Sequence, residues 1–242
     1  MPAEKLIYVA DSKYAPYGNL SAKQITQRVN TICDQLVAKN VKAIVIACNT
    51  ATVNAIDQLR TRLNIPIIGV EPAIKPAAAL SKTKSVGLLV TQATASNQRF
   101  LNLINTHKNG AEVHIQPCPQ LADIIEQGRA NTLKSKQLLQ QYLAPLIEKK
   151  IDTLVLGCTH YPFVAKQIQE IIGDGIQLLE TAKPVTFELK RQLAKLELLA
   201  RNDSKPNKIM TYSSAPSVEL DDVMKALWDY SSIEIQPSLM LI

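Results

Sequence analysis

The sequence predicts an α/β protein of two domains, each built on a doubly wound parallel sheet. Short apolar runs alternate with helical patterns along nearly the whole chain. Two of these runs end alike, at Val45-Ile46-Ala47-Cys48 and at Val155-Leu156-Gly157-Cys158, 110 positions apart. A segment with two nearby prolines, Pro72 and Pro76, separates the two blocks. Alternating strands and helices of these lengths are typical of parallel sheets.

The expected strands are short runs rich in β-branched and aliphatic residues. They cover residues 5–10, 41–47, 65–70, 85–90, 112–116, 151–157, 176–179 and 208–212. Apolar residues that recur every three or four positions predict the helices between them. These begin after Ser21, a plausible N-cap, and continue at residues 50–63, 95–107, 120–129, 132–150, 163–172, 182–200 and 218–230.

The domain boundaries follow from the proline segment and from the last elements. A chain of 242 residues is long enough for two small domains with separate cores. Pro72 limits the next helix to begin after it, so a crossover between domains is expected there. The last predicted strand has no obvious partner in the second block and would return to the first. The expected domains are therefore 1–73 plus 185–242, and 74–184.

Composition argues against several classes of function. The net charge is +6, but the basic residues are scattered and no aromatic-basic cluster accompanies them, which disfavours nucleic-acid binding. No apolar run reaches the roughly 18 residues of a membrane span, and the first residues lack a signal-peptide pattern. We therefore expect a cytoplasmic protein. The four cysteines form no C-x-x-C pair and have no histidine at metal-ligand spacing, so no metal is expected.

Cys48 and Cys158 are the candidate catalytic residues. Each follows a strand and precedes a predicted helix, where the helix dipole is expected to lower the thiol pKa. The carboxyl ends of parallel strands are also where ligands bind in such sheets. Two thiols on opposing domains could remove a proton from one face of a carbon and deliver one to the other, which is racemisation. The alternative is that both are buried structural cysteines.

Polar residues beside these thiols could bind a small substrate. Asn49, Thr50 and Thr159 offer side-chain donors, and helix N-termini offer free backbone N–H groups for carboxylates. His160 lies two residues after Cys158, and its ordinary pKa near working pH makes it a candidate to assist proton transfer.

Three motifs carry a family resemblance. Ala47-Cys48-Asn49-Thr50-Ala51-Thr52, Gly157-Cys158-Thr159-His160-Tyr161-Pro162 and Pro16-Tyr17-Gly18 together resemble the cofactor-independent glutamate racemases, within the aspartate/glutamate racemase superfamily. The likeness runs from Leu6 to about Val185. It implies two similar α/β domains with the active site in the cleft between them. It also implies interconversion of L- and D-glutamate without pyridoxal phosphate or metal, with D-glutamate supplied to peptidoglycan synthesis.

The resemblance assigns roles to individual residues. Cys48 and Cys158 would be the two acid/base residues, each serving one enantiomer, with His160 assisting. Glu126 matches an acidic residue proposed to assist the thiols, although a solvated helix carboxylate is an equally good interpretation of it. The implied substrate-binding residues are Tyr17, Gly18, Asn49, Thr50, Thr94, Thr159 and His160. Glutamate would be the small-molecule partner, and a homodimer is one of the assemblies that we consider.

The chain also departs from the family pattern. The family begins with a strand that ends in an Asp-Ser-Gly-x-Gly-Gly loop, and this sequence has no such loop. Its eight glycines are about 3% of the chain, less than half the usual 7%. We expect a strand-helix unit to be absent, either because the reading frame starts late or because the chain is a truncated relative. Low stability and low activity would follow, and an added upstream unit would restore both.

Two rival functions remain open at this stage. One is an aspartate or other amino-acid racemase of the same superfamily, which would share both thiols. The other is a truncated non-catalytic relative that binds an amino acid without exchanging its Cα proton.

Overall fold

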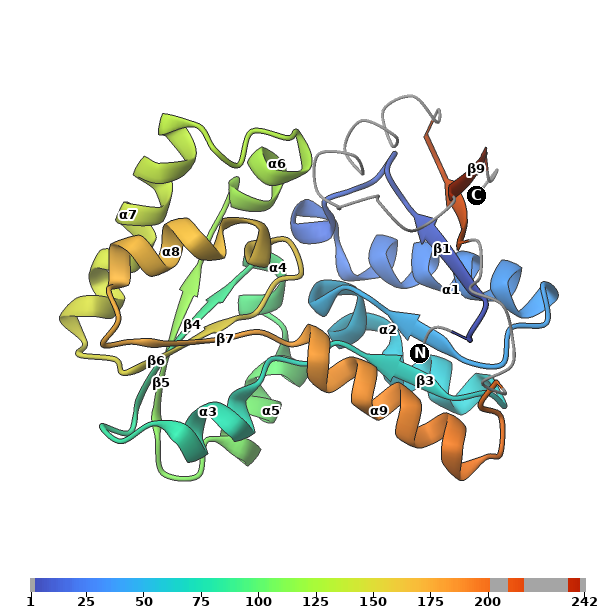
Figure 1. The fold of residues 1–242 in the computed structure, drawn as a ribbon, viewed down its shortest axis with the longest axis horizontal. Coiled ribbons are helices and arrows are strands. Elements are labelled where there is room, and N and C mark those ends of the chain that lie inside the picture. The colour runs from blue at the N-terminus through green and yellow to red at the C-terminus, as the bar shows by residue number, and fades with distance from the viewer. Residues whose placement is uncertain (1–2, 201–208, 216–234, 240–242) are drawn as a thin grey trace.

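The computed structural model describes residues 3–200, 209–215 and 235–239, and its elements form two groups side by side (Figure 1). One group is built on a four-stranded parallel sheet. Its strands, in spatial order, are β5 (Glu112–Pro117), β4 (Ser85–Val90), β6 (Thr153–Leu156) and β7 (Gln177–Leu179). All four residues of β6 are buried, as expected for a parallel sheet covered on both faces.

Helices cover both faces of this sheet (Figure 1). On one face lie α6 (Leu121–Glu126), α7 (Leu133–Glu148) and α8 (Ala165–Ile172); on the other lie α3 (Ile74–Leu80) and α5 (Gln98–His107). Alternate residues of β6 supply the two cores: Leu154 and Leu156 pack in one, and Val155 in the other. This alternation is the two-residue period of a strand, which builds the doubly wound architecture expected from the sequence.

The other group begins with the N-terminal elements of the chain, from β1 to β3. Helix α1 (Ala22–Ala38) begins at Ser21, whose side chain forms a reciprocal capping box with Gln24. Helices α1 and α2 (Asn49–Arg62) pack with β2 (Ile44–Ile46) and β3 (Ile67–Gly69) around one apolar core. Strands β2 and β3 are parallel neighbours. This arrangement places the N-terminus of α2 directly at the carboxyl end of β2.

A late segment of the chain pairs with the first strand. Strand β1 (Leu6–Ala10) lies parallel to β8 (Ile209–Ser213), and β8 lies parallel to β9 (Ile235–Leu239). The helix expected at 218–230 lies outside the described residues. Among the described residues, the chain therefore returns to its own beginning, while the domain boundaries at 73/74 and 184/185 stay a prediction.

A large cavity separates β1 from β2. Within the described part of the chain these strands belong to different sheets. The cavity has a volume of about 1210 Å³ and is lined by the consecutive residues 3–12 and 39–48. Lining by consecutive residues means that the strands present their backbone edges to the cavity, since successive side chains point to opposite faces. Leu6, Tyr8 and Val45 remain exposed there.

Several helices are shorter than the sequence pattern predicts; a capping bond explains one of them and a 3-10 turn another. The helix expected at 95–107 is divided: α4 (Gln92–Ala95) is capped by Thr91, and α5 is capped by Asn97. The helix expected at 163–172 begins as a 3-10 turn, η2 (Tyr161–Val164), before α8. Helix α9 (Ala182–Lys195) ends five residues before the predicted 200.

Candidate active site

The carboxyl ends of β2 and β6 meet where the two groups of elements face each other. Cys48 follows β2, Cys158 follows β6, and the Thr159 hydroxyl donates to the carbonyl oxygen of Ala47 at 3.2 Å. Gly157 lets the end of β6 pack closely against β4, because a Cβ there would lie 2.7 Å from the backbone oxygen of Leu89. This hydrogen bond thus joins Ala47, which precedes Cys48, to Thr159, which follows Cys158.

Cys48 is the N-cap residue of α2. Its Sγ accepts a hydrogen bond from the backbone N–H of Ala51 at 3.4 Å. Burial nevertheless raises the pKa of the Cys48 thiol to about 11, and the nearby Cys158 raises it further against the effect of the Ala51 N–H. The helix N-terminus does lower this pKa, as expected, through the Ala51 N–H, but desolvation outweighs that effect.

Cys158 lies beside a paired histidine. The Nδ1 atom of His160 is 3.7 Å from Cys158 Sγ, and its Nε2 is 2.6 Å from Glu126 Oε2. Burial lowers the pKa of His160, but the hydrogen bonds to Cys158 and Glu126 prevail and raise it to about 10. The imidazole is thus protonated at neutral pH. Because η2 follows Cys158 and α8 begins only at Ala165, the charge beside this thiol comes from His160 rather than from an α-helix N-terminus.

Three threonine hydroxyls form a buried triangle beneath the cysteines. Thr50 lies 2.9 Å from Thr91 and 3.1 Å from Thr94, and Thr91 donates to Thr94 at 3.0 Å, all measured between Oγ1 atoms. The triangle joins α2 to α4 across the two groups of elements. Asn49 is also buried and donates from Nδ2 to the Val70 carbonyl, whereas its Oδ1 has no partner among the described residues.

Tyr17 and Gly18 form part of a short 3-10 turn, η1 (Tyr17–Asn19), after β1. The Tyr17 hydroxyl donates to Asp11 Oδ2 at 2.5 Å, and Arg28 binds both oxygens of the same carboxylate. Gly18 lies against Thr91, where a Cβ would come within 3.3 Å of Thr91 Cβ. The turn is therefore fixed at one side by an ion pair and at the other by the threonine triangle.

The cavity between β1 and β2 extends to these residues. Of the predicted site residues, it is lined by Tyr17, Cys48, Glu126, Thr159 and His160. Cys158 is 7% exposed and lies behind His160. Asn49, Thr50 and Thr94 are buried beneath the cavity floor and do not line it.

Sequence reasoning missed Asp11 and Arg28, the partners of Tyr17. Asp11 directly follows β1, so its place at the carboxyl end of a strand was the signal that could have identified it. Arg28 gave no such signal, because a single basic residue on a helix is ordinarily solvated.

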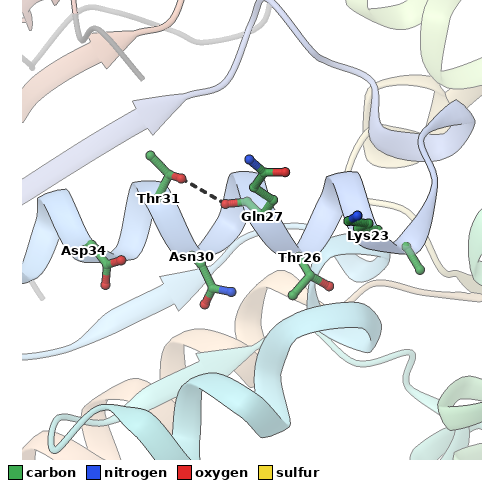
Figure 2. Close-up of a pocket in the computed structure, with 7 residues that line it drawn as sticks. Lys23, Thr26, Gln27, Asn30, Thr31 and Asp34 are labelled. Atoms are coloured by element: carbon green, nitrogen blue, oxygen red, sulfur yellow. Dashed lines mark hydrogen bonds between the residues drawn. The ribbon is translucent and has the colours of Figure 1, made fainter.

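A second hollow lies along α1 (Figure 2). Its volume is about 560 Å³, and it is lined by residues 22–34 of this one helix, of which Thr26 and Asn30 form hydrogen bonds to α2. The Thr31 hydroxyl donates to the Gln27 carbonyl there, which is an ordinary bond within a helix. None of the predicted site residues lies in this hollow, so we place the site in the cavity between β1 and β2.

Neither a metal cluster nor a membrane span is found in the part of the chain that the structure describes. No group of three or more His, Cys, Asp or Glu side chains is arranged to hold a metal ion within residues 3–200, 209–215 and 235–239. In the same residues no helix is long and apolar enough to cross a bilayer. The expectation that the chain works without metal or cofactor stays a prediction.

The sequence profile of the Asp/Glu/Hydantoin racemases matches residues 1–185. The chain belongs to the Asp/Glu/hydantoin racemase family. Within that family it is 40% identical over 228 residues to a glutamate racemase of Methylococcus capsulatus, covering 94% of this chain and 84% of that protein. It is 44% identical over 200 residues to a glutamate racemase of Ralstonia pickettii, covering 83% of this chain and 71% of that protein.

Solved structures of the racemase family share the fold. A glutamate racemase from Bacillus anthracis matches all of this chain and 90% of its own, with a TM-score of 0.87 and 28% identity. One from Francisella tularensis, solved in complex with D-glutamate, matches all of this chain and 88% of its own, with a TM-score of 0.84 and 28% identity. The two-domain α/β architecture expected from the sequence is thereby confirmed.

Proposed function

We propose that this protein is a glutamate racemase that moves the Cα proton of glutamate between two thiols. The observation that carries the proposal is the meeting of β2 and β6, which brings Cys48 and Cys158 to adjacent strand ends joined by the Thr159–Ala47 hydrogen bond. The glutamate racemases of Methylococcus and Ralstonia, at 40% and 44% identity, support glutamate as the substrate.

The two cysteines differ in their surroundings, and this difference suggests a resting state. His160 Nδ1 lies 3.7 Å from Cys158 Sγ, so the imidazolium can stabilise negative charge that develops on this sulfur during proton transfer. The raised pKa of Cys48 favours a protonated thiol on the other side. The Cys158 thiolate would take the Cα proton from one enantiomer, and the Cys48 thiol would deliver its own proton to the opposite face. The reverse reaction begins from the exchanged protonation states, so no net proton is consumed.

The polar groups around the thiols supply the remaining requirements of the reaction. Backbone N–H groups at the start of α2 could bind a carboxylate group of an amino acid. Thr159 and His160 line the cavity on the side of the second sheet. Thr50 and Thr94, bonded to each other beneath the floor, would hold the base of the site rather than contact the substrate by their hydroxyls.

The test is to follow Cα exchange in D₂O and the change in optical rotation for both glutamate enantiomers. Cys48→Ala and Cys158→Ala should each abolish racemisation. The matched control is Cys33→Ala, because Cys33 is 2% exposed and lies on α1, at the part of the cavity lined by that helix rather than at the strand end where Cys48 lies. Normal turnover in either of the first two variants would exclude that cysteine as an acid/base residue.

The same assay separates the rival functions. Faster exchange of L-aspartate than of L-glutamate would indicate an aspartate racemase. Binding of glutamate without deuterium uptake at Cα would indicate a non-catalytic relative. Because low activity is expected if a strand-helix unit is absent, the assay includes a version of the chain with such a unit added before residue 1.

The biological setting follows from the product. D-glutamate is a constituent of peptidoglycan, so the enzyme would serve cell-wall synthesis and act in the cytoplasm, without pyridoxal phosphate. A homodimer stays a prediction, which sedimentation of the purified protein would test.

A further inference from the structure

The loop that carries Tyr17 and Gly18 is fixed by a buried ion pair outside the proposed chemistry. Asp11 is 7% exposed and Arg28 is 14% exposed at their side chains. Arg28 binds Asp11 through two parallel bonds, from Nε at 2.9 Å and from Nη2 at 2.7 Å. Its guanidinium also lies 4.0 Å from the centre of the Tyr14 ring. Two-point bonding of this kind fixes orientation as well as distance.

Asp11 holds the loop on both sides of its turn. Its backbone oxygen accepts from the N–H groups of Tyr14 and Ala15, and its side chain accepts from the Tyr17 hydroxyl. Burial would raise the pKa of Asp11, but the bonds from Arg28 and Tyr17 outweigh it and lower this pKa. The carboxylate is therefore charged throughout the neutral range, and it keeps accepting the hydrogen bond from the Tyr17 hydroxyl.

The hydrogen bond to Asp11 limits the role of the Tyr17 side chain. Its hydroxyl proton is already donated to Asp11, and burial together with the Asp11 carboxylate raises the pKa of the phenol, so the side chain neither donates to a substrate nor acts as a base. What the side chain does is set the position of the Tyr17–Gly18 backbone, which lies between the cavity and Thr91.

We propose that Asp11, Arg28 and Tyr17 form a positioning unit that holds the Tyr17–Gly18 backbone in the place where it binds the amino-acid substrate, without any of the three side chains contacting that substrate. The inference rests on the proposed function and deepens it. It assigns Asp11 and Arg28 as positioning residues, and it makes the Tyr17 side chain an anchor for the backbone that binds substrate.

Steady-state kinetics of single and double variants test the unit. Tyr17→Phe and Asp11→Asn should each raise KM for glutamate by about tenfold and leave kcat within about twofold, because the loss affects binding of the ground state and the transition state alike. The double variant should raise KM no more than the stronger single variant, because both changes remove the same hydrogen bond. Arg28→Lys keeps the charge but loses the two-point bond, so an intermediate KM is expected.

The control is the ion pair between Arg62 and Asp34, which joins α1 to α2 but is exposed. Arg62→Lys should leave KM unchanged. Hydrogen exchange of the segment 11–20 gives a readout that does not depend on turnover, and it should accelerate in Asp11→Asn and Tyr17→Phe but not in Arg62→Lys.

Two results would overturn the inference. One is an unchanged KM in variants whose loop exchanges faster, which would mean that the unit only stabilises the fold. The other is multiplication of the single effects in the double variant, which would mean that Tyr17 contacts the substrate independently. Failure of the proposed function is distinct from both: the wild type would then show no Cα exchange, while the loop would still respond to the variants.

Discussion

Replacement of Glu126 by glutamine tests the charge interaction between Glu126 and His160 beside Cys158. Glu126 Oε2 lies 2.6 Å from His160 Nε2, and the two side chains are 33% and 23% exposed. Glutamine keeps the size and a hydrogen-bonding oxygen but removes the negative charge. Against the lowering effect of burial, the hydrogen bonds to Cys158 and Glu126 and the negative charge of Glu126 raise the His160 pKa to about 10, so removal of that charge should lower it.

The magnitude follows from the pair's partial exposure. Unit charges about 4 Å apart interact by about 4 kcal/mol at an effective dielectric constant of about 20, and solvent screening reduces this for groups that are a quarter to a third exposed. We therefore expect the His160 pKa to fall by about one to two units, equivalent to about 1.4–2.7 kcal/mol. The pKa of Tyr8 on β1 should also fall, because the Glu126 carboxylate contributes, after burial, to its raised value.

The assay is the pH dependence of kcat/KM in both directions, followed by circular dichroism of glutamate. In the wild type, activity that needs the imidazolium should persist to about pH 10. In Glu126→Gln the alkaline limb should move down by about one to two pH units. Glu170→Gln, a change on the exposed face of α8, is the control and should leave the limb in place. An alkaline limb that is identical in Glu126→Gln and the wild type would refute the assignment of Glu126 as the partner of His160.

Three further predictions concern stability. Gly157→Ala should destabilise the fold by about 1–3 kcal/mol and misplace Cys158, because the new Cβ would meet the Leu89 backbone at 2.7 Å. Gly175→Ala is the control, because a Cβ there meets nothing within 4 Å. Equal urea midpoints for the two variants would contradict this prediction. The raised His160 pKa should contribute stability that is complete below about pH 6.5 and is lost as the pH rises through about 10; urea unfolding of Glu126→Gln should show a smaller decline over that window. Addition of a strand-helix unit before residue 1 should raise the melting temperature and protect the β1 and β2 amides from exchange, because their edges face the same cavity; an unchanged melting temperature would show that the cavity does not accept a strand.

Much of the fold is visible in the sequence because its signals are local. The period of apolar residues distinguishes strands from helices, and Ser21 with Gln24 marks the start of α1. Small residues before two cysteines marked the strand ends that meet in the site. The helix breaks at Asn97 and before α8 were missed, because capping bonds and a 3-10 turn interrupt patterns that look continuous.

The sequence by itself determined which residue types follow each strand, and hence that two thiols stand at strand carboxyl ends. Only the tertiary structure decided what surrounds them. The Glu126–His160 pair spans 34 positions and depends on how α6 packs beside the end of β6. The raised pKa of Cys48 reflects burial, which no local pattern encodes. The Asp11–Arg28–Tyr17 contacts likewise arise because α1 packs beside the loop after β1, so the electrostatics of the site are properties of the packed molecule rather than of its motifs.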